Sequence, residues 1–402
     1  MSMFDTPVNR RNTSAEKWDD LDHIFGSGDV LPMWVADMDF RAPEAVIKAL
    51  HERAEHGVFG YSFLGDSYRE AVAGWMLRRH QWQVDPEAVV HAPGVVPALF
   101  HLVGAFTSPG EEVIIQPPVY PPFARVVNNL GRKLLLNPLL RNQEGRYEMD
   151  FKQLESLMNG EAGRAKMLIL CSPHNPVGRV WTRDELSALH ELAERYNVLV
   201  VSDEIHADLT FSPNVHVPFA ALSEQAKEHS IICTAPSKTF NLAALNTSNI
   251  IIHNPELRSK FKDQLSTYEA GQAGIFGLTA AEAAYTHGDE WLDECLDYIR
   301  SNMEGVLQHI TRYKNKDGSP LVTAHLPEAT YLLWLDFRPL GLTADELSAF
   351  MIKEARLGLN SGASFGREGE GFMRMNLACP RSIVDEALQR LNVAMERFTS
   401  GS

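Results

Sequence analysis

The sequence has few cysteines, and none of them has the spacing of a metal site or a redox pair. No CxxC pair occurs, and the fifteen histidines form no HExxH pattern. Three of the four cysteines lie in apolar, strand-like stretches; the four are Cys171, Cys233, Cys295 and Cys379. We therefore predict reduced, buried thiols and no protein-bound metal.

Long apolar runs and an excess of positive charge are also missing. No stretch approaches the roughly 20 apolar residues that a membrane span needs, and residues 1–20 contain no apolar segment typical of a secretion signal. The net charge is −15, whereas nucleic acids and anionic membranes attract basic surfaces. We expect a cytoplasmic protein that binds neither nucleic acid nor membrane.

What is present is the composition of a large globular protein with two domains. The 402 residues are 45% hydrophobic and 22% charged, and a chain of this length usually forms more than one core. Strand-like runs alternate with amphipathic helical patterns such as 182–196, which opens with the capping-box residues Thr182 and Glu185. The strand-like runs are 111–116, 133–140, 166–172, 197–204 and 230–236. This alternation predicts βαβ units and a mostly parallel sheet in an α/β domain.

The pattern changes after about residue 285. A long amphipathic helix is predicted over 289–313, followed by a strand at 330–337. Two further helices are predicted, near 343–356 and 382–398, with a glycine-rich stretch between them. We interpret residues 51–288 as the large domain and 289–402 as a smaller α+β domain.

Polar or aromatic residues follow the ends of four predicted strands: Tyr120, Asn175, Asp203 and Lys238. In open α/β sheets, ligands bind outside the carboxyl ends of the strands. The intervals of 28 residues from Asn175 to Asp203 and 35 from Asp203 to Lys238 each match about one βαβ period. We therefore expect these four side chains to converge on one crevice.

Two interpretations of Asp203 and Lys238 remain open from the residues alone. A carboxylate at the end of the apolar run 198–201 must be paired or protonated, so the two side chains could form a buried ion pair. Alternatively they could hold opposite ends of pyridoxal 5′-phosphate, since a lysine of lowered pKa binds aldehydes and a carboxylate keeps a pyridine nitrogen protonated.

A phosphate site is also suggested upstream. Gly94 precedes a predicted helix within 91–106, where the backbone N–H groups of Val95 and Val96 could point at an anion. Taken alone, ordinary helix capping is the commoner explanation of a glycine in this position.

Three motifs together resemble the pyridoxal-phosphate-dependent aminotransferase superfamily of fold type I: "CSPHNPVG" (171–178), "SDEIHADL" (202–209) and "APSKTFN" (235–241). More narrowly, "LPMWVADMDF" (31–40), "GVFGYS" (57–62) and "MRMNLACPR" (373–381) resemble the MalY/PatB group of cystathionine β-lyases, or C–S lyases. The resemblance runs from about Trp18 to the C-terminus. It implies a seven-stranded, mostly parallel sheet and a small domain that includes residues 1–50.

The resemblance also implies a role for each site residue. Lys238 corresponds to the Schiff-base lysine that also removes the Cα proton, Asp203 to the partner of the pyridine nitrogen, and Tyr120 to the aromatic that stacks on the ring. The cofactor-binding set comprises Gly94, Val95, Val96, Tyr120, Asn175, Asp203, His206, Ser237 and Lys238, with Tyr61 contributed by the neighbouring subunit of a homodimer. The substrate-binding set comprises Arg374, which would grip the α-carboxylate, with Asn175, Ala36 and Trp34.

Some positions allow other interpretations or depart from the family pattern. Arg374 lies in an alternating strand, where an arginine often faces solvent, and Tyr61 and Tyr120 could be ordinary half-buried aromatics. Many relatives have arginine where this chain has Asn246 and glycine where it has Ala244, which removes one charge partner of the phosphate. His206 stands where transaminases commonly have tyrosine.

The leading functional hypothesis is a C–S lyase that releases a thiol, pyruvate and ammonia from cystathionine or a related S-substituted cysteine. A class I/II aminotransferase would use the same groups near the cofactor. A binding or regulatory protein that kept the fold is the third hypothesis, although such a protein has no chemical need for the lysine.

Overall fold

The computed structural model describes residues 2–160 and 165–400, which fold as two compact units. The larger unit comprises Ala42–Asn175 and Arg179–Asp293. The smaller unit comprises the chain up to Arg41, Pro176–Gly178, and the chain from Glu294 onward. The predicted domain bounds of 1–50, 51–288 and 289–402 remain a prediction.

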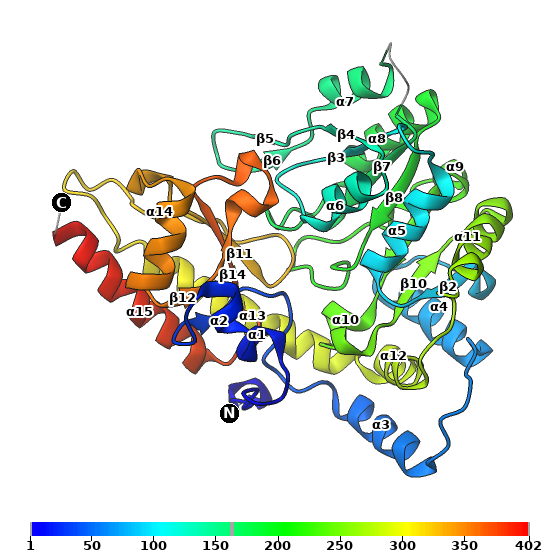
Figure 1. The fold of residues 1–402 in the computed structure, drawn as a ribbon, viewed down its shortest axis with the longest axis horizontal. Helices are drawn as coiled ribbons and strands as arrows, with labels where there is room; N and C mark the ends of the chain where they lie inside the picture. Colours follow the sequence, from blue (N-terminus) through cyan, green and yellow to red (C-terminus); the bar gives the residue numbers. More distant parts are fainter. Residues whose placement is uncertain (1, 161–164, 401–402) are drawn as a thin grey trace. The chain divides into compact units, whose positions relative to one another are not determined.

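The larger unit is built on a seven-stranded sheet in the order β2-β10-β9-β8-β7-β3-β4 (Figure 1). All neighbouring pairs are parallel except the two that involve β10, so the prediction of a mostly parallel seven-stranded sheet is confirmed. Its strands are β2 (Val89–Ala92), β3 (Glu112–Ile115), β4 (Lys133–Leu136), β7 (Met167–Cys171), β8 (Leu199–Asp203), β9 (Ser230–Thr234) and β10 (Ser248–Ile251).

Helices flank this sheet, as the alternating pattern predicts. They are α3 (Glu44–His56), α4 (Asp66–His80), α5 (Val95–Phe106), α6 (Pro122–Asn129), α7 (Phe151–Met158), α8 (Arg183–Tyr196), α9 (Glu224–Glu228), α10 (Pro236–Thr239), α11 (Pro255–Thr267) and α12 (Ile275–His287). The capping box of α8 forms as predicted: the Thr182 hydroxyl accepts from the Glu185 N–H, and the Glu185 carboxylate accepts from the Thr182 N–H.

The predicted strands extend past the observed ones, and at two of them the extra residues form another structure. The run 133–140 is not one strand, because Pro138 cannot donate a ladder hydrogen bond and the chain turns after Leu136. Its end instead forms β5 (Leu140–Arg141), which pairs with β6 (Tyr147–Glu148). The run 230–236 stops at Thr234, because Pro236 has the fixed φ that suits the first position of a helix and begins α10.

The smaller unit contains a three-stranded antiparallel sheet in the order β11-β14-β13 and a short parallel pair, β1 with β12. Its strands are β1 (Leu31–Pro32), β11 (Leu332–Asp336), β12 (Leu357–Gly358), β13 (Asn360–Ser361) and β14 (Phe372–Asn376). Its helices are α1 (Glu16–Asp19), α2 (Leu21–Phe25), α14 (Ala344–Ala349) and α15 (Arg381–Ser400), and α13 (Asp289–Ile310) runs from the larger unit into it.

The helix predicted near 343–356 changes type partway along. It begins with the capping box of Thr343 and Glu346, but only Ala344–Ala349 is α-helical, and Phe350–Glu354 forms a π-helical turn. Within the described ranges, none of the helices is both long enough and apolar enough to span a bilayer.

Candidate active site

The carboxyl ends of six strands share one edge of the large sheet, those of β2, β3, β4, β7, β8 and β9. Strands β3, β7, β8 and β9 run parallel, and β2 runs in the same direction because β10 is antiparallel to both β2 and β9. The chain leaves these ends towards Gly94, Tyr120, Asn175, Asp203 and Lys238. The sheet topology therefore brings the predicted large-domain residues to one edge, where ligands of open α/β sheets bind.

Asp203 is the last residue of β8 and lies deep in the protein. It stands in register between Cys171 of β7 and Cys233 of β9, and only 4% of its surface is exposed. In the described part of the chain, its side chain accepts one hydrogen bond, from the Ile205 N–H at 3.2 Å. Burial raises the pKa of this carboxyl to about 7, against the lowering effect of that hydrogen bond. A cationic partner would restore its charge.

Lys238 lies on the four-residue helix α10, directly after β9. Its positive charge lowers the pKa of Asp203, but burial, the Ile205 N–H and Glu204 all have larger effects on that pKa. The ion-pair and the cofactor interpretations of Lys238 both stay predictions. The neighbouring Thr239 fixes the turn, because its hydroxyl donates to Asp208 Oδ2 at 2.6 Å.

The segment after β2 has the geometry of an anion site. Gly94 has φ +124°, a conformation that other residues rarely adopt, and it directly precedes α5. No side chain caps this helix end, so the N–H groups of its first turn, including those of Val95 and Val96, are not used by a cap. The helix dipole adds to their attraction for a negative group.

The other predicted residues of the larger unit differ in burial. Asn175 and His206 are buried at 4% and 3% exposed, and the Asn175 N–H donates to Cys171 Sγ at 3.4 Å. Tyr120 is half-buried and packs edge-on against Phe123, with ring centroids 6.0 Å apart. Tyr61 is 99% exposed and is not brought to the site within one protomer.

In the smaller unit, Arg374 lies on β14 and is only 4% exposed, so the alternative of a solvent-facing arginine is wrong. Its Nη2 donates to Asn360 Oδ1 at 2.6 Å and to the Trp34 carbonyl at 3.0 Å. Its guanidinium lies 4.9 Å from the centroid of the Phe365 ring. Ala36 accepts at its carbonyl from the Tyr331 hydroxyl at 2.9 Å. Trp34, Ala36 and Arg374 thus share one hydrogen-bonded region.

Asn246 has a structural reason for being asparagine. Its φ is +49°, in the left-handed region that asparagine tolerates better than most side chains, and it ends the turn 243–245. Its side-chain amide donates to the Ala244 carbonyl at 3.3 Å.

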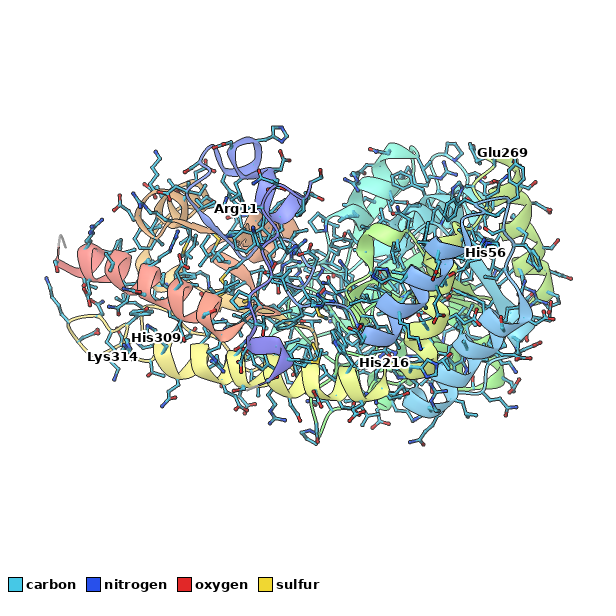
Figure 2. The ribbon with its side chains drawn as sticks, turned by 90° about the horizontal axis from the view of Figure 1, so that it is seen from below. Arg11, His56, His216, Glu269, His309 and Lys314 are labelled. Atoms are coloured by element: carbon cyan, nitrogen blue, oxygen red, sulfur yellow. The ribbon has the colours of Figure 1, made fainter. Side chains whose placement is uncertain are left out.

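Two buried networks near Asp203 and Lys238 were missed at the sequence level. Asp208, two residues after His206, accepts from His80 Nε2 at 2.7 Å and Trp75 Nε1 at 2.9 Å besides Thr239. Glu204 pairs with His216 Nε2 at 2.8 Å, with both side chains 1% exposed (Figure 2 labels His216). The acidic residues of "SDEIHADL" were a signal, but their histidine partners lie too far away in sequence to be foreseen.

Comparison with known proteins identifies the family. Residues 29–391 match the model of the family "Aminotransferase class I and II". The chain is 45% identical to cystathionine beta-lyase PatB of Bacillus subtilis (strain 168), covering 98% of this chain and 99% of that protein, and 33% identical to protein MalY of Escherichia coli (strain K12), covering 96% and 97%. The crystal structure of cystalysin from Treponema denticola, which contains pyridoxal 5′-phosphate, superposes with a TM-score of 0.93 at 38% identity and covers 98% of both chains.

The chain therefore belongs to the class I and II aminotransferase family, with its fold type I architecture. Within that family, it falls in the group that contains PatB and MalY, as the sequence motifs indicated.

The residues present fit pyridoxal 5′-phosphate. The uncapped start of α5 suits a phosphate, the Lys238 amine suits an aldehyde, and the buried Asp203 carboxylate suits a protonated ring nitrogen. The role of each individual residue remains a prediction.

Proposed function

We propose that this protein is a pyridoxal-phosphate-dependent C–S lyase. It cleaves the Cβ–S bond of cystathionine or a related S-substituted cysteine, consumes one water, and releases a thiol, pyruvate and ammonia. The observation that carries the proposal is the buried Asp203 carboxylate, one strand away from the Lys238 turn, in a chain 45% identical to a cystathionine beta-lyase.

When bound, the cofactor supplies an aldehyde for amino groups and an electron-withdrawing ring. The Asp203 carboxylate would hold a proton at the ring nitrogen, and the positive charge of the protonated ring would stabilise the carboxylate anion that burial disfavours. Lys238 would hold the cofactor through its aldehyde, and its free amine would accept the Cα proton of the substrate. Arg374 binds the substrate α-carboxylate, because a guanidinium matches both carboxylate oxygens.

The remaining residues orient these groups. Tyr120 would stack on one face of the ring, and Asn175 and His206 would hydrogen-bond the ring oxygen. Gly94, Val95, Val96 and Ser237 would bind the phosphate. Asn246 contributes no positive charge to the phosphate.

Product analysis tests this function. The purified, cofactor-loaded protein is given L-cystathionine with no keto acid, and pyruvate, ammonia and free thiol are measured. We expect the three products in equal amounts. An aminotransferase would instead require a keto acid and release no thiol, and that result would replace the lyase assignment with the alternative class I/II aminotransferase.

We also propose a homodimer in which Tyr61 reaches the phosphate in the partner's site. The segment around Tyr61 is apolar yet exposed: Val58 is 63%, Phe59 57%, Tyr61 99% and Phe63 83% exposed. A cluster of large exposed apolar side chains in one short segment is typical of a surface that a partner covers.

Tyr61→Phe should weaken binding of the cofactor roughly tenfold to a hundredfold, because one hydrogen bond to a charged group contributes about 1.5–3 kcal/mol. The measurement is cofactor titration followed by absorbance, with Tyr268→Phe as a control for another exposed tyrosine. Unchanged affinity in Tyr61→Phe, or a fully active monomer in light scattering, would contradict the shared site.

We propose a cytoplasmic location. All four cysteines are buried and none forms a disulfide, which suits a reducing compartment.

A further inference from the structure

The segment 34–39 of the smaller unit is held mainly through its backbone carbonyls. The Arg374 guanidinium donates to the Trp34 carbonyl at 3.0 Å, and the Tyr331 hydroxyl donates to the Ala36 carbonyl at 2.9 Å. The Asn376 amide donates to the Val35 carbonyl at 2.7 Å and to the Asp37 carbonyl at 2.6 Å. The side-chain orientations of two residues of β14, Arg374 and Asn376, therefore depend on where this segment lies.

The other side of the segment is fastened by an ion network from the N-terminal arm, defined here as residues 10–18. Lys17 Nζ lies 2.6 Å from Asp39 Oδ2, and the two side chains are only 1% and 2% exposed. Asp39 Oδ1 accepts from Trp18 Nε1 at 2.8 Å and from Arg10 Nη1 at 2.8 Å. Arg10 Nη2 also pairs with Asp37 Oδ2 at 2.6 Å.

This network is unusual in its burial. Fully buried lysines are rare, and an ion pair removed from water needs close geometry and further hydrogen bonds to compensate for lost hydration. Lys17 and its neighbours lower the pKa of the Asp39 carboxyl against the effect of burial, so Asp39 is charged at neutral pH. If the arm only covered a hydrophobic core, a pair of well-packed apolar side chains would stabilise it at least as well as this buried ion pair.

The links form a continuous path from the arm to Arg374. Lys17 and Arg10 fix Asp39 and Asp37, and these residues fix the segment whose Trp34 carbonyl binds Arg374 Nη2. That same Nη2 also donates to Asn360 Oδ1, so two acceptors set the plane of the guanidinium. A bidentate grip on a carboxylate depends on that plane.

We propose that the N-terminal arm is a positioning device for Arg374: the Lys17–Asp39–Arg10 network sets the segment 34–39 and thereby the orientation of the guanidinium that binds the substrate α-carboxylate. This inference rests on the proposed function of Arg374. Lys17, Arg10 and Asp39 are positioning residues, and none of them is assigned a contact with substrate.

The test variant is Lys17→Met/Asp39→Leu, which removes both buried charges together and leaves neither without its partner. Arg10→Met is a milder second variant, because Arg10 is 20% exposed and its loss keeps the Lys17–Asp39 pair. Asp29→Asn is the matched control: it breaks an ion pair with Arg356 in the same unit, where the side chains are 68% and 62% exposed.

Each variant is assayed with an S-substituted L-cysteine and with its α-amide, which lacks the carboxylate. We expect KM for the acid to rise by about tenfold in the double variant, the loss of roughly 1.4 kcal/mol of binding, with kcat nearly unchanged and KM for the amide unchanged. Arg10→Met should show a smaller rise in the same direction, and Asp29→Asn none. A purely structural role would lower the active fraction, and so kcat, equally for both substrates.

A second measurement needs neither cofactor nor activity. In the cofactor-free protein, hydrogen-exchange protection of the backbone amides at positions 37 and 39, corrected for the side chain present, reports whether the segment loosens, because these amides bond to the Val35 and Ala378 carbonyls. Faster exchange is expected in the double variant and not in Asp29→Asn. Unchanged exchange together with equal effects on acid and amide would overturn the positioning role.

Arg374→Lys separates this inference from the proposed function. If Arg374→Lys does not change the preference for acid over amide, the assignment of Arg374 to the carboxylate is wrong. If Arg374→Lys abolishes the preference but Lys17→Met/Asp39→Leu leaves it intact, the assignment holds and the positioning role of the arm is wrong.

Discussion

Lys238→Ala is expected to abolish the yellow colour of the cofactor-loaded protein and to lower turnover roughly 100- to 10,000-fold, the contribution typical of a positioned proton-transfer group. The side chain lies on α10 directly after strand β9, where its positive charge also lowers the pKa of Asp203. Absorbance after cofactor loading and initial rates of pyruvate release measure the two effects.

The matched control is Lys152→Ala, which removes an exposed lysine on α7 of the same unit. It should keep both colour and rate. A Lys238→Ala protein that keeps its colour and more than about a tenth of the wild-type rate would refute the assignment. Such a loss of rate would be smaller than the loss typical when a proton-transfer group is removed.

Asp203→Asn should have opposite effects on the cofactor-free and the loaded protein. In the cofactor-free protein, burial raises the pKa of Asp203 from its ordinary 3.8 to about 7. Its unfolded form therefore loses the proton at lower pH than its folded form, and the folded state becomes less stable as pH rises from about 4 to 7. The full penalty, roughly 4 kcal/mol, is present above pH 7 and absent below pH 4.

Asparagine removes that penalty because it does not ionise. The cofactor-free variant should therefore melt at a higher temperature than wild type at pH 8, with the difference vanishing towards pH 4. In the loaded protein the same change removes the anion that keeps the ring nitrogen protonated, so cofactor affinity and turnover should both fall.

Thermal melts with and without cofactor at a series of pH values measure both effects, and Asp263→Asn on the exposed side of α11 is the control. A variant that is no more stable than wild type at pH 8 without cofactor would show that Asp203 does not carry a raised pKa. Unaltered cofactor affinity would show that it does not face the ring.

The central sheet could be predicted from the sequence because its strands are continuous apolar runs separated by amphipathic helices with clear caps. The strand that ends at Asp203 and the helix opened by Thr182 and Glu185 are examples. Their local signals agree with the tertiary structure, since buried parallel strands need apolar residues on both faces. The polar residues at the strand ends followed from the same topology.

The parts that could not be predicted depend on contacts between residues distant in sequence. The π-helical turn 350–354 continues a helical pattern with a different hydrogen-bond spacing, which side-chain periodicity does not encode. The Lys17–Asp39 pair and the His80–Asp208 pair each look like solvated surface charges until the fold buries them. The burial of Arg374 could not be predicted either, because the alternating pattern of a strand does not show which of its faces is covered.

The most direct test of the account is to locate the cofactor on the chain. The loaded protein is reduced with borohydride, which converts a carbon–nitrogen double bond between cofactor and lysine into a stable single bond, and is then digested and analysed by mass spectrometry. The account predicts one modified lysine per chain, at Lys238. Attachment at any other lysine, or a fully loaded protein with no modified lysine, would contradict it.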